Sequence, residues 1–116
     1  DDDQQAARAT ALIEGRLTRE TPGFVNRIVV VELIWVLESA YGYARDVVAD
    51  LVERMLRTAE LTIEDADDVS EAVRRFRGTG ADLADLLLAI GNVRHGCSET
   101  YTFDRRAART VGFTAL

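Results

Sequence analysis

Carboxylates are the side chains of this 116-residue sequence whose type and spacing could do chemistry, and Glu32, Asp85 and Asp104 are the strongest candidates. The single histidine, His95, and the single cysteine, Cys97, form no cluster of nitrogen or sulfur ligands, and we expect each to fill surface or core. A site made of carboxylate oxygens suits a hard ion such as magnesium or manganese and disfavours zinc. These acids can bind one ion only if the fold brings them together.

Glu32 stands in an apolar stretch, which makes its charge unusual. If residues 28–37 form a helix, apolar side chains such as Ile28 and Val36 lie one turn away from it. A carboxylate buried among them must find a cation, be protonated or reach water, because an unpaired buried charge is expensive. From the residues alone, a salt bridge to an arginine and a metal-binding role stay equally open. We expect the neighbouring Trp35 to pack in the core.

Three further carboxylate positions are open to a structural and a chemical interpretation. Asp82 and Asp85 are three residues apart, so on a helix both lie on one face and repel each other. A cation beside them would relieve that repulsion, whereas two solvated acids in a first helical turn would be stabilised by the helix dipole. Asp104 follows a predicted strand and stands at its carboxyl end, where open α/β sheets bind ligands. It could equally cap the next helix.

The elements that must position these acids alternate between helices and short strands. Asp3 and Asn26 can cap helices, because short polar side chains accept hydrogen bonds from free amides at a helix start. We expect helices over about 4–14, 27–38, 44–56 and 81–94, one carrying Val69 to Phe76, a short one beginning near Asp104, and strands at 24–25, 61–63, 100–103 and 112–116. The pattern predicts an α/β fold with a parallel sheet covered on both faces. We expect the acids of residues 64–68 to be cap and first-turn charges rather than metal ligands.

Composition excludes several classes of protein. The length fits a single domain over residues 1–116, and the formal net charge of -6 argues against a general nucleic-acid coating protein. All 14 basic residues are arginine, so chemistry that needs a lysine is excluded. The segment Gly78-Thr79-Gly80 is no phosphate-binding loop, since it lacks the glycine spacing and the lysine. With one cysteine and no long apolar run, we expect a cytoplasmic protein.

Three motifs carry a resemblance to a known family. Glu32 is separated by two residues from Trp35-Val36-Leu37, the stretch 80–89 contains Asp82 and Asp85, and Thr102-Phe103-Asp104 comes before an alanine- and arginine-rich segment. In order and spacing these motifs resemble the acidic motifs of the PIN domain of the bacterial VapC toxin type. The resemblance covers essentially the whole chain.

The resemblance implies a three-layer α/β/α fold and a metal-dependent endoribonuclease that belongs to a toxin-antitoxin pair. Carried over by residue, Glu32, Asp85 and Asp104 match the acidic site for Mg²⁺ or Mn²⁺, with Asp82 as an accessory acid and Thr102 as a polar neighbour. A homodimer and a VapB-type antitoxin are the implied partners. Next to Asp104, Arg105, Arg106 and Arg109 are candidates to bind the RNA backbone, although each could be a plain solvated charge.

The sequence departs from the family pattern at one position. The family's first acid ends an amino-terminal strand in the middle of the sheet, and no such strand precedes Asp1. We therefore expect an upstream segment with an apolar strand that ends in aspartate, since Asp1, Asp2 or Asp3 could replace that acid only if the chain folded back. The alternative function is a binding module of the same fold without nuclease activity. A receiver domain does not fit, because it needs a lysine on a late strand.

Overall fold

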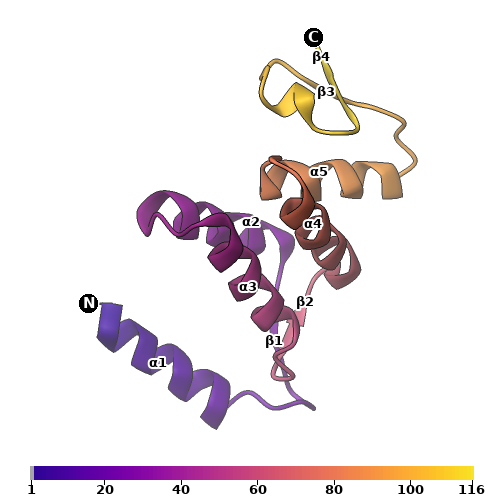
Figure 1. Cartoon of the computed structure of the whole chain (residues 1–116). Helices are drawn as coiled ribbons and strands as arrows, with labels where there is room; N and C mark the ends of the chain where they lie inside the picture. The colour runs from indigo at the N-terminus through magenta and orange to yellow at the C-terminus, as the bar shows by residue number, and fades with distance from the viewer. Residues whose placement is uncertain (1) are drawn as a thin grey trace.

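Helices and short strands alternate along the chain, as the sequence predicts. The computed structural model describes residues 2–116, and Asp1 lies outside the described part. The elements are α1 (Asp2–Gly15), β1 (Gly23–Val25), α2 (Arg27–Trp35), the π-helix η1 (Val36–Ala40), α3 (Arg45–Leu56), β2 (Leu61–Ile63), α4 (Ala66–Gly78), α5 (Leu83–Arg94), β3 (Thr100–Thr102), the 3₁₀-helix η2 (Ala107–Arg109) and β4 (Phe113–Ala115) (Figure 1). The fold is α/β and rich in helix.

The strands form two separate parallel pairs. Strand β1 pairs with β2 in the register Phe24 to Thr62, and β3 pairs with β4 in the register Tyr101 to Thr114. Figure 1 shows the two pairs on opposite sides of the helical body. The predicted parallel pairing is confirmed, but residues 2–116 do not join it into one sheet, because no strand among them lies between the pairs. Within this part of the chain, every strand has one unpaired edge.

Capping residues fix where the helices begin. The Asn26 side chain accepts a hydrogen bond from the Val29 amide at 2.9 Å, which confirms the predicted cap of α2. Asp82 does the same for α5, so that helix begins at Leu83 rather than at Ala81. The predicted cap at Asp3 is wrong, because α1 already begins at Asp2.

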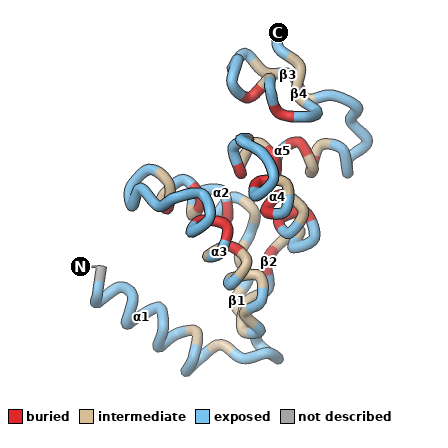
Figure 2. The backbone as a smooth tube through the Cα atoms, viewed as in Figure 1, coloured by how far each residue is buried: buried red, intermediate tan, exposed pale blue. Residues whose placement is uncertain are grey.

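Four helices build the core. Their fully buried side chains include Val30 and Ile34 on α2, Val48 and Val52 on α3, Val73 and Phe76 on α4, and Leu83 and Leu87 on α5. Figure 2 shows buried stretches on all four of these helices, whereas α1 is exposed along nearly its whole length and extends away from the body. The apolar face of α3 therefore packs inside its own domain. Trp35 does not: it is 62% exposed, because Val30 and Ile34 take the inward face of α2.

Arginines neutralise the acidic stretch that leads into α4. Arg27 pairs with Asp65 at 2.8 Å, and Arg94 pairs with both Asp65 and the buried Asp68. The guanidinium of Arg27 crosses α5 at Gly91, where an added Cβ would lie 2.6 Å from its Nη2 atom. Asp68 lies in the first turn of α4, as predicted, but Asp65 makes no capping hydrogen bond with its side chain, and ion pairs with arginines hold both acids.

None of the described helices combines the length and the hydrophobicity needed to cross a membrane.

Candidate active site

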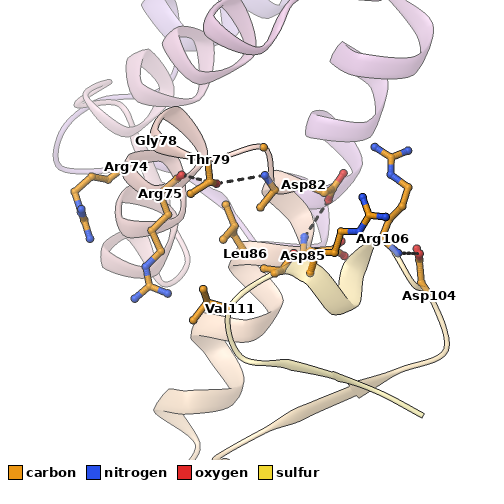
Figure 3. Close-up of a pocket in the computed structure, with 14 residues that line it drawn as sticks. Arg74, Arg75, Gly78, Thr79, Asp82, Asp85, Leu86, Asp104, Arg106 and Val111 are labelled. Atoms are coloured by element: carbon orange, nitrogen blue, oxygen red, sulfur yellow. Dashed lines mark hydrogen bonds between the residues drawn. The ribbon is translucent and has the colours of Figure 1, made fainter.

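Three of the four predicted acids line one groove. Its volume is about 910 Å³, and it lies between the carboxyl half of α4, the start of α5 and the η2 region (Figure 3). The lining residues are Arg74, Arg75, Gly78, Thr79, Gly80, Ala81, Asp82, Asp85, Leu86, Asp104, Arg106, Arg109, Thr110 and Val111. Acids from α5 and from the segment after β3 are therefore close in space although they are far apart in sequence. We call this hollow the acidic groove.

The turn between α4 and α5 positions Asp82. A single guanidinium nitrogen of Arg45, Nη2, donates hydrogen bonds to the carbonyls of Phe76, Thr79 and Ala81 at 2.8, 2.8 and 2.9 Å. The same guanidinium stacks over the Phe76 ring, 3.7 Å from its centroid. Asp82 follows directly, and its Oδ1 accepts a hydrogen bond from the Asp85 amide at 3.0 Å. Its Oδ2 has no hydrogen-bond partner among residues 2–116.

Asp104 is fixed in a similar way after β3. Its amide donates to the Thr102 hydroxyl at 3.0 Å, and its Oδ1 accepts from the amides of Arg106 and Ala107 at 2.8 and 3.4 Å. Thr102 therefore lies beside Asp104, and its supporting role in the site stays a prediction. The capping role considered for Asp104 is present, and it leaves the carboxylate on the groove (Figure 3).

Asp85 lies at the centre of the acids. Partial burial raises the pKa of its carboxyl, and the negative charges of Asp82 and Asp104 raise it further. Asp85 also lines a second, smaller hollow of about 290 Å³ together with Glu32, Ile28, Val31 and Leu88. It is therefore the residue that connects Glu32 with the acidic groove.

Glu32 reaches water instead of being buried. The side chain is exposed and forms no ion pair with an arginine in the described structure. Of the outcomes considered from the sequence, exposure to water is the one observed, and a structural salt bridge is absent within residues 2–116. The carboxylate is free to bind a cation.

One acid near the groove has no signal in the sequence. Glu38 lies in the π-helix η1, and a turn of π-helix inserted after an α-helix often occurs at functional sites. Burial raises its pKa, the Asp82 charge raises it further, and Arg45 lowers it. Its place beside Asp82 depends on the change of helix type after Trp35, which no residue pattern predicts.

Comparison with known proteins decides the family. The family model of the PIN domain matches residues 1–112, nearly the whole chain. The chain belongs to the PIN domain family. It is also 26% identical over 93 residues to a VapC ribonuclease of Aquifex aeolicus (strain VF5), an alignment that covers 80% of this chain and 68% of that protein. No solved structure gives a significant match.

The carboxylates of this PIN domain are the ligand type that a hard cation prefers, but the described acids do not surround a single ion position. Within residues 2–116, Asp82, Asp85 and Asp104 form no ion pair with an arginine. Partial burial raises the pKa of Asp85, and the charges of Asp82 and Asp104, which a cation would offset, raise it further. Within residues 2–116, however, no three acidic, histidine or cysteine side chains lie close enough to hold one ion together. The donor type fits magnesium or manganese; the complete ligand set stays a prediction.

The PIN domain's arginines divide between the groove and other surfaces. Arg106 and Arg109 line the acidic groove, in agreement with their predicted position beside Asp104, while the exposed Arg105 does not line it. Arg74 and Arg75 line it as well, from α4. No residue pattern distinguishes Arg74 and Arg75 from other arginines, because they stand in an ordinary amphipathic helix.

Proposed function

We propose that this PIN domain is a Mg²⁺- or Mn²⁺-dependent endoribonuclease and the toxin of a toxin-antitoxin pair that acts in the cytoplasm. The observation that supports the proposal most is the acidic groove, where Asp82, Asp85 and Asp104 form no ion pair with a guanidinium group of residues 2–116 and lie beside arginines that could bind phosphate. The similarity to a VapC ribonuclease supports the same reaction.

In the proposed reaction the acids bind the metal ion and the arginines bind the RNA backbone. Glu32, Asp85 and Asp104 hold the divalent ion, and Asp82 assists as an accessory ligand through its free Oδ2. When bound, the ion supplies charge stabilisation at the phosphate and lowers the pKa of a water molecule. Arg106 and Arg109 hold the RNA backbone so that a phosphodiester lies over the acids, and Arg105 binds phosphate outside the groove. Thr102 holds Asp104 in place through the Asp104 amide.

We propose that a further carboxylate completes the ligand set, because no three acidic, histidine or cysteine side chains among residues 2–116 lie close enough to hold one ion together.

The test is manganese-dependent cleavage of RNA by the full-length protein. The variants Glu32→Gln, Asp85→Asn and Asp104→Asn should each lose most of the activity, since each removes one anionic ligand. Asp67→Asn is the matched control, because Asp67 is an exposed acid in the first turn of α4. Undiminished cleavage by all three groove variants would rule the mechanism out.

A catalytically inactive PIN-like binding module is the second candidate. The lack of a three-acid cluster among the described residues favours it. Such a module would keep the fold and bind no manganese. Calorimetric titration of the full-length protein with manganese therefore separates it from the nuclease.

We propose a homodimer and a VapB-type antitoxin as partners. The exposed apolar side chains of Ile28 and Trp35 on α2 support a protein-binding surface, because large exposed apolar patches mark such surfaces. A monomeric mass by light scattering at micromolar concentration would contradict the dimer.

A further inference from the structure

Arg74 and Arg75 both donate hydrogen bonds to the carboxylate of Glu71. The Arg74 Nε atom donates to Glu71 Oε2 at 2.8 Å and its Nη2 atom to Glu71 Oε1, while the Arg75 Nε atom donates to the same Oε1 at 3.1 Å. Arg74 therefore grips the carboxylate in the two-pronged geometry that guanidinium groups also use for phosphate. Both arginines line the acidic groove, and Glu71 does not.

The two arginines occupy the side of the groove away from the acids. Figure 3 shows Arg74 and Arg75 reaching out from α4 on one side and Asp82 and Asp104 on the other, with Leu86 and Val111 between them. A nucleic-acid strand that crosses the groove would therefore meet a carboxylate-lined section and an arginine-lined section in succession. Two phosphates of one strand could occupy the two sections.

The ion pairs with Glu71 are open to exchange. The Arg74 side chain is 71% exposed and the Glu71 side chain is 33% exposed, and ion pairs at such positions contribute little net stability. Arg75 uses only Nε toward Glu71, so its two Nη groups have donors to spare. Since the arginines lower the pKa of Glu71 to about 2, Glu71 stays charged at every pH near neutrality and competes with phosphate continuously.

We propose that Arg74 and Arg75 form a second RNA-backbone subsite of the acidic groove, and that Glu71 is a built-in competitor which limits the affinity of this subsite for single-stranded RNA. The proposal rests on the proposed ribonuclease function. In a chain of net charge -6, a subsite of this kind supplies attraction that the overall charge does not. Release of Arg74 from Glu71 then frees its guanidinium group for phosphate and strengthens RNA binding.

The test measures RNA binding separately from cleavage. Fluorescence anisotropy of a labelled single-stranded oligouridylate is followed with the full-length protein in EDTA. Glu71→Gln should tighten binding about threefold to fivefold, because it removes a competing charge while leaving both arginines in place. Arg74→Gln combined with Arg75→Gln should weaken binding about tenfold and should lower the slope of log Kd against log salt by about 1.4, at about 0.7 per phosphate contact.

Matched controls separate a subsite from a change in net charge. Glu53 also holds two arginines, Arg57 and Arg77, but away from the groove, so Glu53→Gln makes the same charge change elsewhere. The pair Arg54→Gln and Arg57→Gln matches the double arginine variant. Equal effects of Glu71→Gln and Glu53→Gln, unchanged binding by the double groove variant, or no binding of RNA at all would overturn the proposal.

Failure of the subsite and failure of the nuclease give different results. If the arginine variants bind as the wild type does while Asp85→Asn abolishes cleavage, only the subsite is wrong. If binding depends on Arg74 and Arg75 while no cleavage occurs with manganese, the subsite stands and the nuclease is wrong. Thermal unfolding followed by circular dichroism checks that each variant is folded.

Discussion

Two groups of acids stand at the starts of consecutive helices and have opposite surroundings. At the start of α4, Asp65 and Asp68 are paired with Arg27 and Arg94. At the start of α5, Asp82 and Asp85 form no ion pair with an arginine of residues 2–116, and partial burial together with the charges of Asp82 and Asp104 raises the pKa of Asp85. All 14 basic residues of the chain are arginine, and we propose that their distribution separates acids that hold the fold together from acids that take part in the proposed reaction.

The largest expected effect is on cleavage by Asp85→Asn. Replacing this central acid should reduce manganese-dependent cleavage by about 100-fold or more, since loss of a residue that only supports a metal ligand already costs about 10- to 100-fold. The melting temperature should not fall, because the substitution removes like-charge repulsion. Cleavage by Asp85→Asn near the wild-type rate would contradict the proposal that the acids at the start of α5, unlike those at the start of α4, take part in the reaction.

Asp68→Asn should have the opposite effect, with a loss of stability and normal cleavage. It breaks the pair with Arg94 at a site where the Asp68 side chain is 12% exposed, and so it should lower the free energy of unfolding. We expect about 1–3 kcal/mol, less than for a fully buried pair because water reaches Arg94. Urea denaturation measures this loss. Cleavage by the folded fraction should be normal, and a stable variant with lost cleavage would place Asp68 among the chemical acids.

Asp82 allows the structural and chemical roles to be separated at one position. Asp82→Ala removes the cap of α5 and should cost about 1 kcal/mol in thermal or urea unfolding. Asp82→Asn keeps a capping oxygen, so stability should be retained while cleavage falls modestly. If the asparagine variant cleaves RNA as well as the wild type does, Asp82 is a cap and no ligand.

The pH dependence of stability should give the smallest effect. Because the pKa of Asp85 is raised in the folded protein, its ionisation is less favourable there than in the unfolded chain. Stability is therefore lost as pH rises through the raised pKa, and it is retained below the ordinary value. In EDTA, the stability advantage of Asp85→Asn over the wild type should grow between about pH 4 and pH 7. An advantage that shrinks over this range would contradict the assigned electrostatics.

Local patterns predicted the elements well, since each depends on neighbouring residues. Asn26 marked the start of α2, and the apolar spacing around Val48 and Val52 marked the inward face of α3. Trp35 was misplaced, because an apolar helix offers several faces to the core and tertiary packing chose the one with Val30 and Ile34.

Of the residues that line the groove, the sequence predicts the acids better than the arginines. Motif spacing identified Asp82, Asp85 and Asp104, and the structure places these three on one groove. No pattern in the sequence singles out Arg45, Arg74 or Arg75. Their positions at the groove depend on contacts between α3, α4 and the turn before α5. The split into two strand pairs depends on which segments lie side by side, and no single stretch of sequence encodes that.

Calorimetric titration of manganese into the full-length protein tests the central claim most directly, with Asp85→Asn compared against Asp68→Asn. The wild type and Asp68→Asn should bind manganese alike, because the acids paired with arginines take no part in the site. Asp85→Asn should show little or no binding. Equal binding by all three proteins, or loss of binding in Asp68→Asn alone, would contradict the assignment of chemistry to the acidic groove.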